Sequence, residues 1–149
     1  MGTAAEFALE IDQELEFSLD EWRLIIRRIA REALKRVVEK TPVGNPDLWK
    51  GPAPSGYVGG TARNNWYVSL GEAGFEVSTV AEESGNVALL RGDVVFARYR
   101  QLNDFDFPDI VIYNNLPYIN RLEFDGWSTQ APNGMVQPTV DELQVRALT

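Results

Sequence analysis

A long amphipathic segment, residues 19–40, constrains the fold of this chain more than any other feature. Its apolar residues recur at intervals of three and four, which places them along one face of an α-helix. They are Trp22, Ile25, Ile26, Ile29, Ala33 and Val37. The preceding Ser18-Leu19-Asp20-Glu21 matches a capping box, and Thr41-Pro42 ends the segment because the residue before proline avoids the α region. We therefore predict a helix over residues 19–40.

Two segments flank this helix. Residues 1–17 form an N-terminal arm whose apolar spacing suits a short helix or a strand, and both alternatives stay open. Residues 45–60 are rich in proline and glycine, which predicts an extended loop without regular structure. Trp49 and Tyr57 in this loop need an apolar surface to dock on. Their own domain and a neighbouring subunit are equally good candidates for that surface.

The second half of the chain alternates between strand and helix patterns. Residues 65–70 and 75–80 alternate in polarity around a glycine-containing turn, which predicts a β-hairpin. The apolar run 110–113 predicts a central, covered strand. Helical spacing predicts a helix over 86–102, a short one within 116–124, and a last one that begins at 137–138.

This order of elements predicts an α+β fold. We expect a small, mostly antiparallel sheet with the long N-terminal helix packed on one face, further helices and the long Pro/Gly loop. The 149 residues, 44% of them hydrophobic, suffice for a single domain over residues 1–149. No apolar run approaches the roughly 18 residues that span a bilayer. The arm carries five acids and no basic residue, so it does not match a targeting peptide.

The composition removes the commonest catalytic side chains. The chain has no histidine and no cysteine, so it lacks the usual general base, metal ligand and thiolate nucleophile. Its glycine-rich segment 56–61 lacks the Lys-Ser/Thr that holds phosphates. No serine stands in a Gly-x-Ser-x-Gly turn. These motifs therefore offer no catalytic constellation, and we expect no cofactor.

Acidic residues leave two chemical alternatives. Asp104, Asp106 and Asp109 could offer oxygen ligands to calcium or magnesium, but they lack the loop pattern of a calcium site, and a solvated turn is favoured. Glu123 and Asp125 could form a carboxylate pair for glycoside hydrolysis. One sequence does not set the separation of these two carboxylates, and a non-catalytic role is favoured. We accordingly predict no catalytic, cofactor-binding or metal site.

Charge is unevenly distributed along the chain. The net charge of −8 disfavours broad binding to a nucleic-acid backbone. Seven of the fourteen basic residues nevertheless lie between residues 20 and 40. A basic helix on an acidic body suits self-assembly, because one subunit's basic patch can meet another's acidic surface. The favoured alternative is a solvated helix face with local ion pairs.

Two stretches together resemble a known family. The first is Thr41-Pro42-Val43-Gly44, followed after the loop by Gly60-Thr61-Ala62-Arg63-Asn64-Asn65-Trp66. The second comprises Asn114-Asn115-Leu116-Pro117-Tyr118-Ile119, Arg121-Leu122-Glu123, Gly126-Trp127-Ser128, Gln130-Ala131-Pro132 and Gly134-Met135-Val136. Their order and spacing resemble the neck, or head–tail joining, proteins of long-tailed bacteriophages, the lambda Z-like minor tail or tail-completion proteins. The chain departs from that family in its long insertion after Val43 and in one extra residue before Gly126.

The resemblance implies a non-enzymatic virion component. Such a subunit forms a homo-oligomeric ring at the head–tail junction, between tail terminator or tail tube proteins and head-side connector or stopper proteins. DNA would only pass through the channel, no membrane is involved, and assembly takes place in the host cytoplasm. An acidic or neutral channel lining would let DNA slide, whereas a lining of Arg23, Arg27 and Arg31 would contradict that hypothesis.

The expected interface residues follow from these stretches and from the basic helix. We predict contacts with neighbouring subunits by Trp49, Tyr57, Arg63, Pro117, Tyr118, Arg121, Trp127, Met135, Val136, Arg23, Arg27 and Arg31. Packing within the same domain is the alternative for each of them. The alternative function is a small acidic ligand-binding or regulatory α+β module, which would be a monomer or dimer with a pocket.

Overall fold

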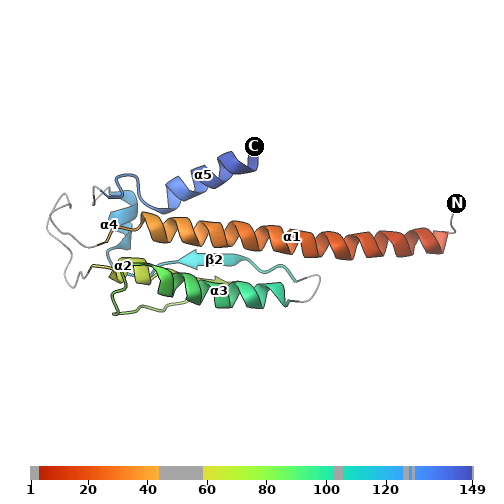
Figure 1. The fold of residues 1–149 in the computed structure, drawn as a ribbon, viewed down its shortest axis with the longest axis horizontal. Helices are drawn as coiled ribbons and strands as arrows, with labels where there is room; N and C mark the ends of the chain where they lie inside the picture. Colours follow the sequence, from red (N-terminus) through yellow and green to blue (C-terminus); the bar gives the residue numbers. More distant parts are fainter. Residues whose placement is uncertain (1–3, 44–58, 103–105, 126–127, 129, 149) are drawn as a thin grey trace.

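The computed structural model describes residues 4–43, 59–102, 106–125, 128 and 130–148 (Figure 1). Its elements, in chain order, are α1 (Ala4–Lys40), α2 (Thr61–Asn64), β1 (Tyr67–Leu70), α3 (Asn86–Arg100), β2 (Ile110–Tyr113), α4 (Ile119–Phe124) and α5 (Val136–Leu148). The predicted loop 45–60, with Trp49 and Tyr57, lies almost wholly outside the described residues, and so does Trp127.

The fold is α+β, with a long N-terminal helix and a two-stranded antiparallel sheet. Val68 pairs with Ile112 and Leu70 pairs with Ile110, so these four side chains share one face of the sheet. In Figure 1, α1 runs through the middle of the molecule, with α5 on one side and β2 and α3 on the other. Val68 and Ile112 therefore contribute to a core that also holds Leu34, Phe96 and Leu122.

The helix α1 is longer than the sequence pattern indicates. It runs without interruption from Ala4, which resolves the open choice between helix and strand in favour of helix. Ser18 lies inside it, so the predicted capping box does not begin a helix and that prediction is wrong. Figure 1 shows the N-terminal half of α1 projecting beyond every other element. The end at Lys40, just before Thr41-Pro42, is as predicted.

The face of α1 that packs into the core differs from the predicted stripe. Ala30, Leu34, Val37 and Val38 are buried, of which only Val37 was expected. Trp22, Ile25 and Ile29 instead remain 42–58% exposed. Both sets repeat at three- and four-residue intervals, so the helix carries two apolar arcs. Hydrophobic periodicity finds the helix but cannot choose which arc meets the core.

The predicted hairpin between 65–70 and 75–80 is wrong. The strand β1 forms within the first segment, but its partner is β2, more than thirty residues further along. Residues 75–80 form no strand. Instead, asparagine side chains form hydrogen bonds with the backbone of residues 75–80, where a partner strand would otherwise bind. The alternating pattern is therefore present without the hydrogen bonding that usually accompanies it.

The remaining predicted elements are present, and the boundaries of the helices are shifted. α3 confirms the helix over 86–102, and its large exposed apolar residues are Val87, Leu90 and Val94, three of the residues whose spacing predicts it. β2 confirms the strand at 110–113, but in a two-stranded sheet it is not central, and its side chains are half-buried. α4 and α5 confirm the two later helices.

Candidate functional site

The two stretches that carry the family resemblance meet at one end of the molecule, around Thr41. The Thr41 hydroxyl donates to the carbonyl of Val37 at 2.5 Å and accepts from Nε1 of Trp66 at 2.7 Å. Thr41 and Trp66 are both buried. A buried hydroxyl and a buried indole N–H both need hydrogen-bond partners. Here the indole N–H of Trp66 donates to the Thr41 hydroxyl, so each group satisfies the other. This contact joins the end of α1 to the start of β1.

Arg63 holds the same junction from α2. Its guanidinium donates to the carbonyl of Thr41 at 2.8 Å, of Glu39 at 3.2 Å and of Glu83 at 2.7 Å. The last carbonyls of a helix lack partners within the helix and carry partial negative charge, so a cation suits this position. Burial lowers the pKa of Arg63, and the nearby charge of Glu39 opposes that effect. Arg63 therefore caps α1.

Asparagine side chains bind the extended segment 74–80. Asn65 accepts from the backbone N–H of Ser78 at 2.8 Å and donates to its carbonyl at 2.9 Å. Asn64 donates to the carbonyl of Val80 at 3.0 Å, and Asn115 to that of Gly74 at 3.0 Å. A primary amide offers a donor and an acceptor side by side, like a peptide group. These asparagines replace a neighbouring strand.

The second stretch is tied directly to the first. Asn114 donates to the carbonyl of Ala62 at 3.0 Å. The amide of Gln130 accepts from the N–H of Val43 at 3.0 Å and donates to its carbonyl at 3.3 Å. We call the set Thr41, Val43, Arg63, Asn64, Asn65, Trp66, Asn114, Asn115 and Gln130 the junction cluster. Its polar side chains mainly form hydrogen bonds with backbone groups, so the cluster holds the backbone of these segments in position.

Glu123 caps the last helix. Its carboxylate accepts from the N–H groups of Met135 at 2.6 Å, Val136 at 3.0 Å and Gln137 at 3.0 Å. These are the unpaired donors at the positive end of α5. A Cβ on Gly134 would lie 2.4 Å from the carbonyl oxygen of Glu123, and the φ of Gly134 is +84°, so only glycine fits there. Glu123 is thus engaged in structure, which disfavours its pairing with Asp125 as a catalytic acid.

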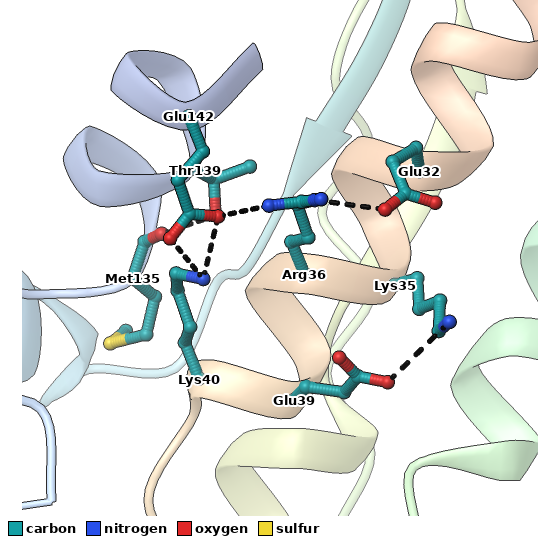
Figure 2. A network of polar contacts seen from close by, with 8 residues as sticks. All are labelled: Glu32, Lys35, Arg36, Glu39, Lys40, Met135, Thr139 and Glu142. Atoms are coloured by element: carbon teal, nitrogen blue, oxygen red, sulfur yellow. Dashed lines mark hydrogen bonds and ion pairs between the residues drawn. The ribbon is translucent and has the colours of Figure 1, made fainter. Parts of the chain in front are cut away.

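Ion pairs fasten α5 to α1 (Figure 2). Glu142 of α5 pairs with Arg36 and, at 2.9 Å, with Lys40. Arg36 also pairs with Glu32 at 2.9 Å, one turn earlier on α1. The hydrogen bonds from Lys40 and Arg36 lower the pKa of Glu142. Because the carboxylate is favoured in the folded chain, this contact depends on pH.

The predicted interface residues fall into three groups. Tyr118 and Met135 are buried, and Arg23 is buried with hydrogen bonds to the carbonyls of Leu102 at 3.1 Å and Asp106 at 3.0 Å. Arg63 belongs to the junction cluster, and Arg31 pairs with Asp93 at 2.9 Å. The exposed or half-buried members are Pro117, Arg121, Val136 and Arg27. Tyr118, Met135 and Arg23 therefore do not lie at the surface of the free chain.

Two exposed apolar stripes lie on helix surfaces that the sequence pattern did not identify. The α1 stripe consists of Trp22, Ile25 and Ile29. The α3 stripe consists of Val87, Leu90 and Val94, which are 46–67% exposed. Apolar side chains gathered on a helix surface are typical of protein–protein contact sites. Helical periodicity locates these residues in the sequence, but the same periodicity also indicates packing in a core.

A surface hollow of about 630 Å³ lies among β2, α4 and the start of α5. Its lining includes Trp66, Tyr113, Ile119, Phe124 and Met135. Glu123 is the charged residue of the lining, and its carboxylate is already bonded to α5. Among the described residues, the hollow is apolar and amide-lined, without a free charged group to orient a polar ligand.

A second hollow, of about 560 Å³, is lined by Asp20, Glu21, Arg23, Leu24, Arg27 and Arg100. Among the described residues, no group of three or more His, Cys, Asp or Glu lies close enough together to hold a metal ion. Nor is any helix in the described part of the chain sufficiently long and apolar to cross a membrane. Asp104 lies outside the described residues.

No family model, curated protein or solved structure matches this chain.

Proposed function

We propose that this chain is a structural, non-enzymatic protein of a tailed bacteriophage. It forms a homo-oligomeric ring at the head–tail junction, where it joins the tail to the head-side connector and lets DNA pass. Its neighbours in the virion are tail terminator or tail tube proteins on one side and connector or stopper proteins on the other. The subunit is made in the host cytoplasm and ends in the virion.

The observation that carries this proposal is the junction cluster. The two stretches that resemble neck proteins are separated by about fifty residues, yet Asn114 and Gln130 of the second bond directly to Ala62 and Val43 of the first. A chance match of two unrelated segments gives no reason for them to meet. Their contact is expected if both belong to one inherited scaffold.

Surface properties also support an assembly role. The α1 stripe and the α3 stripe leave apolar side chains in water, a cost that subunit contacts would remove. The chain is acidic, and two of the basic residues that could line a DNA channel are already engaged. These are Arg23, bound to backbone carbonyls, and Arg31, paired with Asp93. An acidic channel lets DNA slide because it repels phosphate.

A genetic experiment tests the proposal. The gene is removed from its phage, and lysates are examined by electron microscopy and plated for infectivity. We expect filled heads and separate tails, or defective tails, with infectivity restored when the gene is supplied in trans. Complete, infectious particles in the deletion lysate would refute the neck role.

The alternative, a small ligand-binding or regulatory module, draws support from the apolar hollow beside β2. It predicts that small apolar molecules bind there and raise the melting temperature of the free chain. A fragment screen by thermal shift, repeated with Phe124→Ala to alter the exposed rim, distinguishes this function from assembly. Stabilisation that the substitution abolishes would favour the ligand-binding function.

A further inference from the structure

The two exposed stripes have the same residue spacing. Trp22, Ile25 and Ile29 stand at positions i, i+3 and i+7 of α1, and Val87, Leu90 and Val94 stand at the same positions of α3. This is the a, d, a spacing of the heptad that forms the seam between coiled-coil helices. Each stripe can therefore insert its side chains between those of a helix with the other's pattern.

The stripes face opposite sides of the molecule. A Cβ on Gly92 of α3 would lie 2.3 Å from Cδ2 of Leu34, so these two residues mark where α1 and α3 face each other. At about 100° per residue, the α1 stripe lies about 120–180° around its helix from Leu34. By the same rule the α3 stripe lies about 140–160° from Gly92. One subunit therefore presents two different apolar surfaces in opposite directions.

The free half of α1 adds a charge argument. Before Arg23 the sequence contains seven acidic residues and no basic one. The last turn of α3 instead carries Arg98 and Arg100, both exposed. Within one chain, Asp20 and Glu21 line a hollow together with Arg100. The acidic end of α1 and the basic end of α3 are also complementary in charge between one copy and another.

We propose that the α1 stripe of one copy packs antiparallel on the α3 stripe of the next copy. In heptad register this sets Ile25 opposite Val94 and Ile29 opposite Leu90. The same register brings Glu21 near Arg100, which are opposite charges at the flanking positions. Arg28 likewise comes near Asp93 of the next copy, a carboxylate that also pairs with Arg31 of its own chain.

The contact is heterologous, because it joins two different surfaces, and such contacts form rings when the rotation between copies closes. The inference thus rests on the proposed function and identifies the subunit contact of the ring. Pairing of two α1 stripes would leave the α3 stripe in water, whereas the heterologous contact covers both. A partner of a different sequence on either stripe is the remaining alternative.

The absence of cysteine makes a cross-linking test direct. The double variant Ile25→Cys/Val94→Cys is purified, oxidised over a series of protein concentrations and analysed on non-reducing gels. The two positions lie on opposite sides of one chain, so a bond within the chain is excluded by the short Cα separation that a disulfide requires. We expect a ladder of dimers, trimers and larger species that reduction collapses to monomer.

Mixing the single variants tests whether the α1 stripe of one copy contacts the α3 stripe of another. Differently tagged Ile25→Cys and Val94→Cys chains should form only dimers with one copy of each. The matched control Ile25→Cys/Glu72→Cys places its second cysteine at an exposed site after β1 and should give no ladder. Far-UV circular dichroism shows whether each variant keeps its helices.

Each other outcome overturns the inference. Dimers of Ile25→Cys alone would show that α1 stripes pair with each other. A chain that yields no cross-linked species at any concentration would exclude the proposed contact between copies. Rings seen by electron microscopy of the double variant without this cross-link would refute the interface but leave the neck function standing. The phage deletion described above tests that function independently.

Discussion

Removal of the Glu123 carboxylate should destabilise the fold to a predictable extent. In the variant Glu123→Ala the N–H of Met135, a fully buried residue, loses its bond of 2.6 Å. An orphaned buried donor costs about 1–3 kcal/mol. The N–H groups of Val136 and Gln137 are at exposed residues, so water replaces their bonds at little cost. Loss of negative charge at the helix N-terminus adds about 0.3–1 kcal/mol.

The expected loss is therefore about 1–4 kcal/mol in the free energy of unfolding. For a chain of this size, that lowers the melting temperature by about 3–16 °C. Glu123→Gln keeps one carbonyl oxygen for Met135 and should lose about half as much. Thermal unfolding followed by circular dichroism measures both variants at one protein concentration. Hydrogen exchange at residues 135–137 should accelerate in the alanine variant.

Asp125→Ala is the matched control, since this neighbouring carboxylate is exposed and should change stability by less than about 0.5 kcal/mol. A capping role for Glu123 is refuted if the free energy of unfolding of Glu123→Ala lies within about 0.5 kcal/mol of the wild-type value. It is also refuted if the glutamine and alanine variants are equally destabilised. Wild-type stability, together with loss of a hydrolytic activity in Glu123→Gln/Asp125→Asn, would instead revive the carboxylate-pair hypothesis.

Three further predictions concern the core, the asparagines and pH. Leu34→Ala should cost about 2–5 kcal/mol in urea unfolding of the monomer, and Ile29→Ala less than about 1, because only Leu34 is buried; equal losses would contradict the assigned core face. Asn65→Asp replaces an amide donor by a carboxylate oxygen that repels the carbonyls of Thr61 and Ser78. Limited proteolysis should therefore cleave residues 73–81 faster in this variant than in the wild type. Unchanged cleavage would show that other contacts hold the segment. The folded-state pKa of Glu142 is lowered, so its contribution is present above the ordinary glutamate pKa and is lost as pH falls through the folded value. Glu142→Gln should thus lower the urea midpoint at neutral pH and flatten its decline toward about pH 4, whereas parallel pH profiles would refute the coupling.

The candidate site was only partly predictable. The family resemblance pointed to the two stretches that meet in the junction cluster. It did not assign their roles. Arg63 and Met135 were expected at an interface, and the structure places one on the backbone of α1 and the other in the core. Those roles depend on contacts with residues far away in the sequence, which spacing does not reveal.

What the sequence determined by itself is the kind and position of most elements. Residues 19–40 and 86–102 have periodicities, and residues 110–113 an apolar run, that depend on near neighbours alone. Pro42 ends its helix through local steric repulsion. Such signals need no knowledge of the rest of the chain. The absence of histidine and cysteine likewise limits the available chemistry, whichever fold the chain adopts.

Only the tertiary structure decided which surfaces meet. The helix α1 carries two apolar arcs of similar spacing, and the core takes Leu34 and Val38 because α3 presents Gly92 opposite Leu34. β1 pairs with β2, since asparagine amides already satisfy the backbone of the segment that follows β1. Burial and backbone hydrogen bonding are properties of the whole chain, so one segment's pattern cannot determine its partner. The arc of α1 that the core leaves exposed is the surface we assign to a second copy.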